Sequence, residues 1–335
     1  MIKLCVIEGD AVGHEVVPAA IRVLRAVLPD VELHTAEAGF ETLEKQGTPL
    51  PDETVELAKA CGAVIFGAAA SPSFPVDGYF SPIIRLRNIL KTFANIRPVR
   101  YLPVSTAREG VDMIVVRENT EDLYVVDEYT DANGDRGTAQ KVITRAATER
   151  VAYLAFELAR SSQREKVTIV HKANILPQSD GLFRRVALEV SEKYPDIHTD
   201  ELLVDTAAYW MVKEPTRFDV ILTPNLYGDI LSDMAAAWGG GLGLAPSVNI
   251  SDATAIAEPV HGSAPDIAGK GIANPTAAIL SIALLIRHHW KQGDAATRIE
   301  NAVRETLHAG VHTADIFIDG AMSTEEFTDS VIDKL

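Results

Sequence analysis

The stretch Ile2-Lys3-Leu4-Cys5-Val6-Ile7-Glu8-Gly9-Asp10 decides the fold class. Its apolar first part predicts a short buried strand, and its Glu-Gly-Asp end predicts a turn. A helix is predicted over residues 14–27, because apolar residues recur there along one stripe. The alternation then repeats, which predicts an α/β fold with a largely parallel sheet. The further strands are predicted over residues 31–35, 63–66, 113–117, 166–171, 202–205 and 220–223, and a further helix over residues 51–60.

Composition narrows the class of protein. The chain has 335 residues, of which 47% are hydrophobic and 23% charged, so it can bury a sizeable core in one large domain or two. Its formal charge of -16 argues against non-specific binding to nucleic acid or to an anionic membrane. Cys5 and Cys61 lie in apolar stretches and are predicted to be reduced, which favours a cytoplasmic location. No signal-peptide layout opens the chain, and the longest apolar run, residues 277–286, is too short for a bilayer.

Two segments are rich in turn residues. Residues 131–135, Asp-Ala-Asn-Gly-Asp, predict a protruding hairpin. Residues 239–243, which include four glycines, fit a hinge between two domains. No GxGxxG motif follows a strand, so the dinucleotide-binding motif of Rossmann folds is not present.

A pair of aspartates is the first candidate for chemistry. Asp229 and Asp233 are four residues apart on a predicted helix and therefore share one face. A third carboxylate, Asp205, follows a predicted strand. Oxygen ligands of this kind suit Mg2+ or Mn2+. The alternative for the pair alone is a solvated acidic face.

Three arginines form a second candidate group. Arg87 lies on a helix that Ser81 and Pro82 are predicted to begin, whereas Arg97 and Arg117 lie near the ends of elements. Each alone is typical of a surface side chain. Together, in an acidic chain, they favour a pocket for a substrate with several carboxylates, because arginine binds carboxylates in a bidentate manner. The helix N-terminus at Ser81 adds backbone N–H donors for a further anion.

Tyr124 and the segment around Lys172 form a third group. Lys172 and Asn174 come directly after a predicted strand, where ligands bind in open α/β sheets. A lysine there is commonly solvated. The functional alternative is a lysine with a lowered pKa that accepts a proton, paired with a tyrosine that donates one.

Residues 258–275 form a long loop of small residues, and small side chains let the backbone approach a flat ligand closely. An acidic residue there could accept hydrogen bonds from ribose hydroxyls and repel a 2'-phosphate. From the residues alone the ligand stays open, and a single histidine such as His261 is more often structural.

Taken together, these motifs resemble the β-decarboxylating dehydrogenases, which include isocitrate, isopropylmalate and homoisocitrate dehydrogenases. The resemblance rests on the Gly9-Asp10 turn, Val116-Arg117-Glu118-Asn119, the 225–233 run and the 258–274 loop, which occur in family order. It runs from Ile2 to about Ala278 and weakens after that. Within the family, residues 81–83, 120–124 and 178–183 look most like homoisocitrate dehydrogenase.

The resemblance implies a reaction and roles for the residues. A 2-hydroxy acid gives hydride to NAD, loses its β-carboxylate as CO2, and leaves an enol that is protonated. Lys172 would help to remove the hydroxyl proton and Tyr124 would protonate the enol, while Asp205, Asp229 and Asp233 would hold Mg2+ or Mn2+. The implied substrate residues are Ser81, Arg87, Arg97, Arg117, Tyr124, Lys172 and Asn174. The implied NAD residues are Glu258, His261, Gly262, Ser263, Ala264, Asp266, Ile267 and Asn274, with Asp266 and Ile267 typical of the NAD-dependent form.

The resemblance also implies an isopropylmalate dehydrogenase-like α/β fold, in which two domains share a large mixed, mostly parallel sheet flanked by helices. Residues 1–95 and 241–335 would form the cofactor-binding domain, and residues 96–240 the domain for substrate, metal and dimerisation. The family forms homodimers, in which Lys172 and Asp205 would enter the partner subunit's site. Higher oligomers are compatible with this. Ala11 and His14 replace the usual glycine and proline near the expected nicotinamide end.

The identity of the substrate is the part of the function that the sequence determines least. Ile83 and Ile84 are predicted to share the face of Arg87, and Arg85 to point away from it. Apolar walls suit isopropylmalate, and they also suit the extra methylene of homoisocitrate if Ser81 receives its distal carboxylate. The leading hypothesis is oxidative decarboxylation of homoisocitrate to 2-oxoadipate, in lysine biosynthesis by the aminoadipate route. The alternatives are isocitrate or 3-isopropylmalate dehydrogenase, a non-catalytic regulatory subunit, and a metal-dependent lyase that works without NAD.

Overall fold

The computed structural model describes residues 2–335. The chain forms two compact units. Unit 1 contains the N-terminal part up to Thr92 together with Tyr101–Glu109 and Ala236–Leu335, and unit 2 contains Phe93–Arg100 and Gly110–Ala235. The chain thus re-enters unit 1 shortly before the glycine-rich residues 239–243.

The strands of unit 1 follow the order β2-β1-β3-β12-β11. The pairs β1–β2, β1–β3 and β3–β12 are parallel, whereas β11 and β12 are antiparallel. The strands are β1 (Lys3–Gly9), β2 (Glu32–Ala36), β3 (Ala63–Ala68), β11 (Val248–Ile250) and β12 (Ala255–Ala257). The turn after β1 needs glycine at position 9, because Gly9 has φ +78° and a Cβ there would lie 1.8 Å from the Ala68 carbonyl oxygen.

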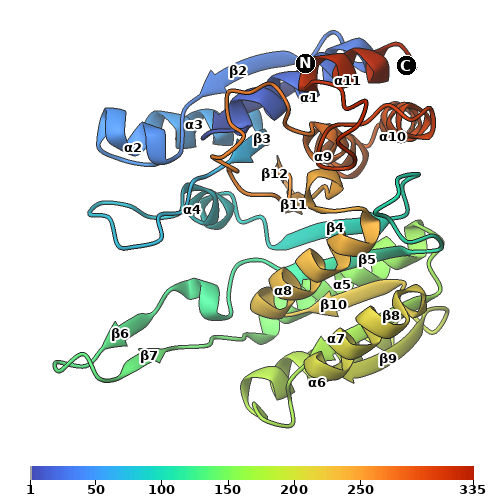
Figure 1. Cartoon of the computed structure of the whole chain (residues 1–335). Coiled ribbons are helices and arrows are strands. Elements are labelled where there is room, and N and C mark those ends of the chain that lie inside the picture. The colour runs from blue at the N-terminus through green and yellow to red at the C-terminus, as the bar shows by residue number, and fades with distance from the viewer. Residues whose placement is uncertain (1) are drawn as a thin grey trace. The chain divides into compact units, whose positions relative to one another are not determined.

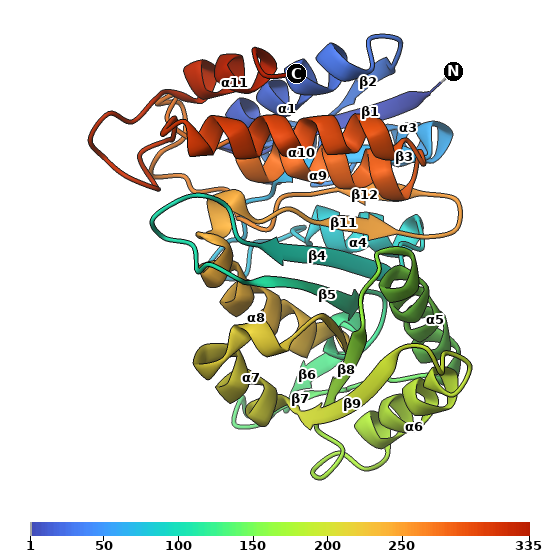
Figure 2. The same cartoon turned by 90° about the vertical axis from the view of Figure 1, so that its right-hand side faces the viewer.

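Helices cover both faces of the unit 1 strands (Figure 1, Figure 2). Cys5 and Ile7 belong to a core cluster that includes residues of α3 and α4, so alternate residues of β1 point to this face. Helices α1 and α9 pack against each other, and α9 also packs against α10. The helices are α1 (Gly13–Val27), α2 (Phe40–Gln46), α3 (Asp52–Cys61), α4 (Pro82–Ile89), α9 (Thr276–His288), α10 (Gly293–His308) and α11 (Thr324–Ile332), with short 3-10 turns at Ala237–Gly239 and Leu242–Leu244.

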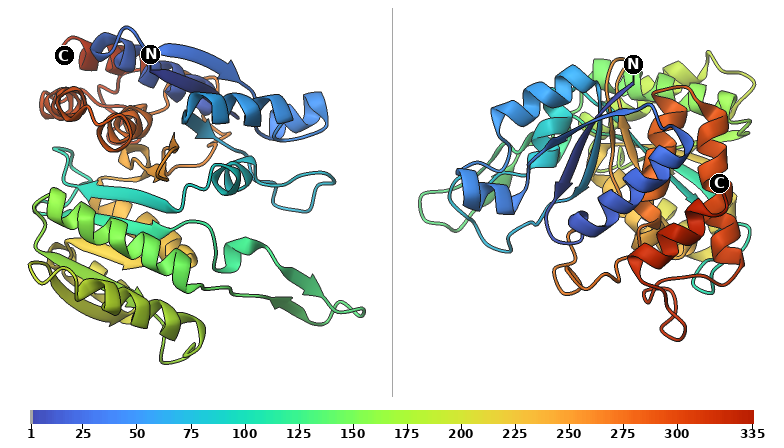
Figure 3. Two further views of the ribbon diagram at one scale, coloured as in Figure 1. Left: turned by 180° about the vertical axis from the view of Figure 1, so that it is seen from behind. Right: turned by 90° about the horizontal axis from the view of Figure 1, so that it is seen from above.

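The strands of unit 2 follow the order β4-β5-β10-β8-β9. Only β4–β5 is antiparallel among the pairs in this series. Helices α5 and α6 pack against each other on one face, and α8 lies on the opposite face (Figure 1, Figure 3). The strands are β4 (Ala94–Arg100), β5 (Asp112–Glu118), β8 (Lys166–His171), β9 (His198–Leu203) and β10 (Val220–Thr223). The helices are α5 (Arg145–Ser161), α6 (Ser179–Ser191), α7 (Val204–Lys213) and α8 (Asn225–Ala236), with 3-10 turns at Leu123–Val125 and Pro215–Arg217.

The predicted α/β class, with a mixed and mostly parallel sheet flanked by helices, is confirmed in each unit. Strands β8 and β10 have the predicted bounds, and the predicted hairpin is β6 (Glu128–Thr130) with β7 (Gly137–Ala139), which projects from unit 2 in Figure 1. No helix among residues 2–335 is long and apolar enough to cross a membrane. Both cysteines are free thiols.

The strand predicted over residues 202–205 is wrong. Strand β9 ends at Leu203, and Asp205 lies in the first turn of α7. Strand β9 is the last strand of its series and its residues are partly exposed, so it lacks the apolar run that reveals a central strand. Aspartate is also favourable in the first turn of a helix, because it complements the helix dipole.

Candidate active site

The antiparallel pairing of β4 with β5 brings two of the predicted arginines together. Asn95 pairs with Arg117, and Arg97 pairs with Val115, so the two arginines are diagonal neighbours on adjacent strands. Both arginine residues are buried, with 6% and 1% of their surfaces exposed. Buried guanidinium groups need anionic or polar partners. The structure supplies these from α8.

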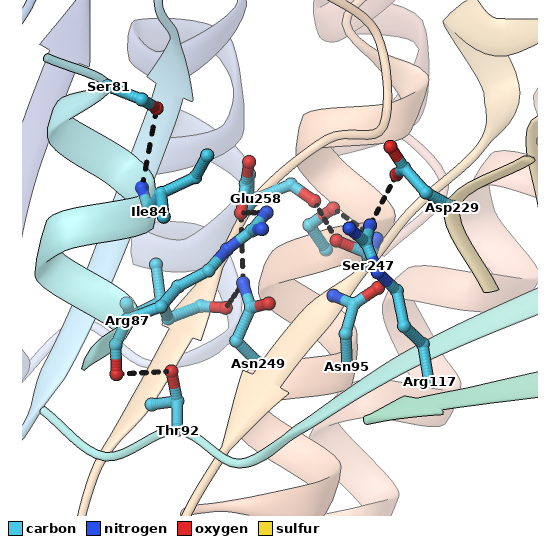
Figure 4. A network of polar contacts seen from close by, with 12 residues as sticks. Ser81, Ile84, Arg87, Thr92, Asn95, Arg117, Asp229, Ser247, Asn249 and Glu258 are labelled. Atoms are coloured by element: carbon cyan, nitrogen blue, oxygen red, sulfur yellow. Dashed lines mark hydrogen bonds and ion pairs between the residues drawn. The ribbon is translucent and has the colours of Figure 1, made fainter. Parts of the chain in front are cut away.

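Helix α8 presents Asp229 and Asp233 to the two arginines. Arg97 donates from Nη1 to Asp233 Oδ1 at 3.0 Å and from Nη2 to Asp229 Oδ1 at 3.3 Å. Arg117 also donates to Asp229, as Figure 4 shows. Helix α8 can approach Arg117 because residue 228 is glycine: a Cβ there would lie 2.6 Å from Arg117 Cγ. Predicted residues from two strands and one helix therefore meet in unit 2.

Tyr124 completes this cluster. Its hydroxyl donates to Asp229 Oδ2 at 2.6 Å, and the Arg117 guanidinium lies 4.8 Å from the centre of its ring. Burial and the Asp229 carboxylate raise the pKa of the Tyr124 phenol, although the charge of Arg117 opposes them. Burial and repulsion from Asp229 likewise raise the pKa of Asp233 against the effect of Arg97. The tyrosine is thus protonated at neutral pH and can donate a proton.

Three carboxylates for which the sequence predicts no role hold the loop before Tyr124. Glu118 accepts hydrogen bonds from the backbone N–H groups of Thr120 and Glu121, and Asp122 accepts one from Leu226 at the start of α8. Glu121 accepts from both the backbone N–H and the hydroxyl of Thr144. The concentration of acidic residues over 118–122 is the sequence feature that could have predicted this role, because buried carboxylates at the end of a strand must bind nearby donors.

Lys172 and Asp205 lie together. Lys172 Nζ is 2.5 Å from Asp205 Oδ1, and Asn174 is exposed two residues beyond Lys172. The carboxylate of Asp205 is 63% exposed, and the ion pair with Lys172 lowers its pKa. Within residues 2–335 no three His, Cys, Asp or Glu side chains of one chain converge on a point that could hold a metal ion. One chain therefore offers Asp229 and Asp233 as a pair of oxygen donors, and Asp205 separately.

The donor set of unit 2 suits a hard divalent cation. Asp229 and Asp233 are one helical turn apart and project from the same face, with side chains 37% and 52% exposed. The two carboxylates repel each other, and the positive charges of the arginines balance this repulsion. A divalent cation between the carboxylates would relieve it as well. Asp229 and Asp233, two of the three predicted metal ligands, are therefore suited to hold such a cation.

In unit 1, Arg87 and Glu258 form a buried ion pair. Arg87 Nη2 lies 2.6 Å from Glu258 Oε2, and Asn249 Nδ2 donates to the same oxygen at 2.9 Å (Figure 4). A predicted substrate residue and a predicted NAD residue are thus direct partners. Within the described part of the chain, Arg87 Nε and, in unit 2, Arg117 Nη2 are buried donor atoms without a hydrogen-bond partner. Each has an N–H group to spare for an anionic ligand.

Helix α4 begins as predicted, with Ser81 as its N-cap and Pro82 in its first turn. The Ser81 hydroxyl accepts from the Ile84 N–H at 3.5 Å (Figure 4). Arg85 is exposed, as expected. Ile83, however, belongs to the core cluster of unit 1 and only Ile84 is partly exposed, so the two isoleucines are not equivalent.

Hydrogen bonds attach the loop after β12 to residues at the start of α1. Val12 N–H donates to the Ser263 carbonyl at 3.1 Å, and Gly269 N–H donates to Glu15 Oε1 at 2.6 Å. Ala264 has φ +41°, and Gly262 and Asp266 beside it are exposed. Ile267 is partly buried and its N–H donates to the Ala264 carbonyl, so that the backbone turns between them.

Two further predicted loop residues have defined partners. His261 Nδ1 lies 2.9 Å from the Gly262 carbonyl oxygen, and burial lowers the pKa of His261, which favours the neutral ring. Asn274 donates to Asp315 at 3.1 Å and accepts from the Thr276 N–H at 3.0 Å.

The turn after β1 accommodates its two unusual residues. Asp10 is buried and accepts backbone hydrogen bonds from Phe40, Glu41 and Ala70 at 2.7–2.9 Å. Ala11 has φ +54°, a conformation that favours glycine. His14 lies between Glu8 at 2.8 Å and Glu41 at 3.3 Å. Burial alone would lower the pKa of His14, but these carboxylates outweigh burial and raise it.

Comparison with known proteins places these features in a family context. The sequence model described as isocitrate/isopropylmalate dehydrogenase matches residues 3–331, so the resemblance extends beyond Ala278, where it was predicted to weaken. The chain is 50% identical to an isocitrate/homoisocitrate dehydrogenase of Thermus thermophilus over 99% of this chain and 98% of that protein. It is 46% identical to a 3-isopropylmalate dehydrogenase of Archaeoglobus fulgidus, with full coverage of both. A solved isocitrate dehydrogenase from Methylococcus capsulatus superposes with a TM-score of 0.96 at 42% identity, covering 100% and 99% of the two chains.

Proposed function

The chain belongs to the isocitrate/isopropylmalate dehydrogenase family, and from this premise we propose that it oxidises and decarboxylates homoisocitrate to 2-oxoadipate with NAD and a divalent metal. Members of the family are dehydrogenases that act on small 2-hydroxy acids with several carboxylates, and this chain is one of them. The observation that carries the proposal is the cluster of Arg97, Arg117, Tyr124 and Asp229 in unit 2. It combines carboxylate-binding groups, a proton donor and a metal ligand.

Each residue has a chemical task in this scheme. Lys172, in its neutral form, takes the proton of the substrate hydroxyl as the C–H hydride leaves, and the β-carboxylate then departs as CO2. Tyr124, whose raised pKa keeps it protonated, returns a proton to the carbon of the resulting enol. Arg97 and Arg117 bind the carboxylates of the substrate, and Arg117 Nη2 is a buried donor suited to this.

The cofactors would bind to different residues. NAD, when bound, supplies the hydride acceptor, and the loop with His261, Gly262, Ser263, Ala264, Asp266, Ile267 and Asn274 in unit 1 would hold it. Asp229 and Asp233 would hold Mg2+ or Mn2+, which supplies electrostatic stabilisation of the negative charge that develops on the substrate oxygen. Glu258 would act on NAD only indirectly, because its carboxylate binds Arg87 and Asn249.

The preference for homoisocitrate rests on α4 and on the relatives. The half-buried Ile84 can pack against the methylene groups of the substrate arm, while the N–H groups at the helix N-terminus beside Ser81 would receive its anionic end. The Thermus relative is named for both isocitrate and homoisocitrate, and a relative from Methanocaldococcus jannaschii, 45% identical, is named for homoisocitrate alone. The Archaeoglobus relative is named for 3-isopropylmalate and the solved Methylococcus structure for isocitrate. The test is kcat/KM for the three substrates, measured side by side with NAD and Mg2+. A preference for isocitrate or 3-isopropylmalate would keep the chemistry and refute the assigned substrate.

The separation of Lys172 and Asp205 from the Asp229 cluster supports a homodimer with shared active sites. Lys172 and Asp205 form their own pair, and both would complete the site of a second copy. A hybrid dimer tests this. Tyr124→Phe and Lys172→Met homodimers should be inactive, whereas a hybrid of the two contains one intact site, made of Tyr124 from one chain and Lys172 from the other. The hybrid should recover about half of the wild-type kcat per dimer, and an inactive hybrid would exclude shared sites.

A regulatory subunit is the second candidate from a different class. Such a chain would lack part of the catalytic set, yet Tyr124, Lys172 and the three aspartates are all present. Turnover by the purified chain alone, followed as the gain of NADH absorbance at 340 nm, separates the two. The same assay distinguishes a dehydrogenase from a lyase, which would release CO2 without NADH.

A further inference from the structure

Lys141, a residue outside the predicted site, lies between two fully buried carboxylates of unit 2. Its Nζ is 2.6 Å from Asp180 Oδ1 and 3.4 Å from Asp122 Oδ1, and both carboxylates are 0% exposed. The ammonium also lies 4.3 Å from the centre of the Tyr227 ring, a favourable cation–π distance. Burial alone would lower the pKa of Lys141, but the two carboxylates outweigh burial and raise it, so this lysine stays charged. It neutralises carboxylates that could not stay ionised and unpaired in this interior.

Each of these carboxylates holds the backbone of a catalytic segment. Asp122 accepts hydrogen bonds from Leu123 N–H and Leu226 N–H, both at 2.9 Å, and so fixes the turn that carries Tyr124 to the start of α8. Asp180 Oδ2 accepts the N–H of Lys172 at 2.6 Å. Asp180 Oδ1 faces Lys141 Nζ, and Tyr227, whose ring Lys141 also contacts, interacts with the same carboxylate. One lysine therefore joins the Tyr124 segment to the Lys172 segment, which are far apart in the sequence.

We propose that Lys141 is a positioning residue for both proton-transfer groups, holding Tyr124 through Asp122 and Lys172 through Asp180. This inference rests on the proposed function, in which Tyr124 serves the chain's own site and Lys172 serves the partner's. Lys141 then connects the two sites of the dimer within each chain. Loss of its charge leaves two buried carboxylates to repel each other, so both segments shift while the carboxylate-binding arginines keep their own partners.

Three variants test the role in the homodimer. Lys141→Met keeps the length of the side chain and removes its charge, and should lower kcat at least about tenfold with less than a threefold change in KM. Lys141→Arg keeps the charge and should recover most of kcat. Lys141→Gln replaces the methionine variant if that dimer does not fold. A folded Lys141→Met dimer with kcat within twofold of wild type would overturn the proposal.

Arg164 provides a matched control for a purely structural role. It is a partly buried cation that bridges Asp112 and Asp219, at 2.5 and 3.0 Å, next to the N-terminal ends of β5 and β10. Tyr124 and Lys172 follow the C-terminal ends of β5 and β8. Arg164→Met should lower the melting temperature and leave kcat unchanged. If both variants lower kcat in proportion to their loss of stability, the role of Lys141 is structural and the proposal fails.

In the hybrid dimer, the effect of Lys141 on Lys172 can be measured separately from its effect on Tyr124. Its single intact site takes Lys172 from the Tyr124→Phe chain and Tyr124 from the Lys172→Met chain. Lys141→Met added to the first chain tests the effect on Lys172, and added to the second tests the effect on Tyr124. We expect kcat to fall at least threefold in each case, and no fall in either would refute the linkage. If the parent hybrid is itself inactive, the shared-site proposal fails, whereas the homodimer variants still decide the role of Lys141.

Discussion

The hydroxyl of Tyr124 donates a 2.6 Å hydrogen bond to Oδ2 of Asp229, so the proposed proton donor touches a proposed metal ligand. The same carboxylate receives Arg117 through its other oxygen. In the proposed mechanism Asp229 therefore connects substrate binding, metal binding and proton transfer in unit 2, and changes at this residue should affect all three.

Asp229→Asn should raise the Mg2+ concentration needed for half-maximal activity at least tenfold, because one anionic ligand is lost while the shape is kept. It should also lower kcat, since asparagine is uncharged and keeps only one of the two oxygens that accept from Tyr124 and Arg117. Titration of activity with Mg2+ after removal of bound metal by a chelator measures both effects. The exposed Asp333 in the C-terminal segment is the matched control, and Asp333→Asn should titrate like wild type. An unchanged Mg2+ requirement in Asp229→Asn would show that the acidic pair is not a metal site.

Glu121→Gln should make stability less dependent on pH. Burial raises the pKa of Glu121 to about 7 against the opposing hydrogen bonds from Thr144. In the unfolded chain this group has its ordinary pKa of 4.5, so the folded state binds more protons between the two values. Its contribution to stability is therefore present below about pH 4.5 and is lost as the pH rises to about 7. The loss amounts to about 3 kcal/mol.

Urea unfolding at intervals from pH 5 to pH 8 checks this expectation. The decline of the unfolding free energy between pH 5 and pH 7 should be smaller in Glu121→Gln than in wild type. Glu53→Gln, at an exposed position in α3, serves as the control and should follow the wild-type slope. Equal slopes for Glu121→Gln and wild type would mean that Glu121 ionises normally in the folded protein.

Gly228→Ala should lower the unfolding free energy by about 1–3 kcal/mol, the usual cost of overpacking a buried contact. The new methyl group would lie 2.6 Å from Cγ and 2.7 Å from Cβ of Arg117, and 3.1 Å from Thr223 Cγ2. Because Arg117 and Asp229 must then move apart, kcat/KM should fall as well. Chemical denaturation measures the first effect. Gly137→Ala is the control, since a Cβ there meets nothing within 4 Å. Stability equal to wild type would disprove the close packing of α8 on Arg117.

Asp266→Lys combined with Ile267→Tyr should shift cofactor preference from NAD towards NADP. A carboxylate repels a 2'-phosphate, whereas lysine attracts it. Asp266 is exposed, so its replacement should leave the fold intact. The ratio of kcat/KM values for NAD and NADP is the readout, with melting temperature as the control for folding. If the ratio does not move, the adenosine ribose binds elsewhere.

Much of the candidate site could be predicted from local patterns in the sequence. The spacing of Asp229 and Asp233 placed both on one face of α8, and the Ser81-Pro82 pair marked the start of α4. Local pattern could not separate Ile83 from Ile84, because both are within one turn of Arg87 and only packing shows which one enters the core. It misplaced Asp205 because β9 is a partly exposed strand without a clear apolar run.

The sequence by itself determined the α/β class, the family and the identity of the chemical groups, because these depend on residue type, periodicity and order along the chain. Only the tertiary structure decided which groups touch. Glu258 pairs with Arg87 and Lys141 pairs with Asp180, although each pair is widely separated in sequence. Such partnerships arise because buried charges must be neutralised by whatever groups the fold brings within a few ångströms, and no local pattern records that distance.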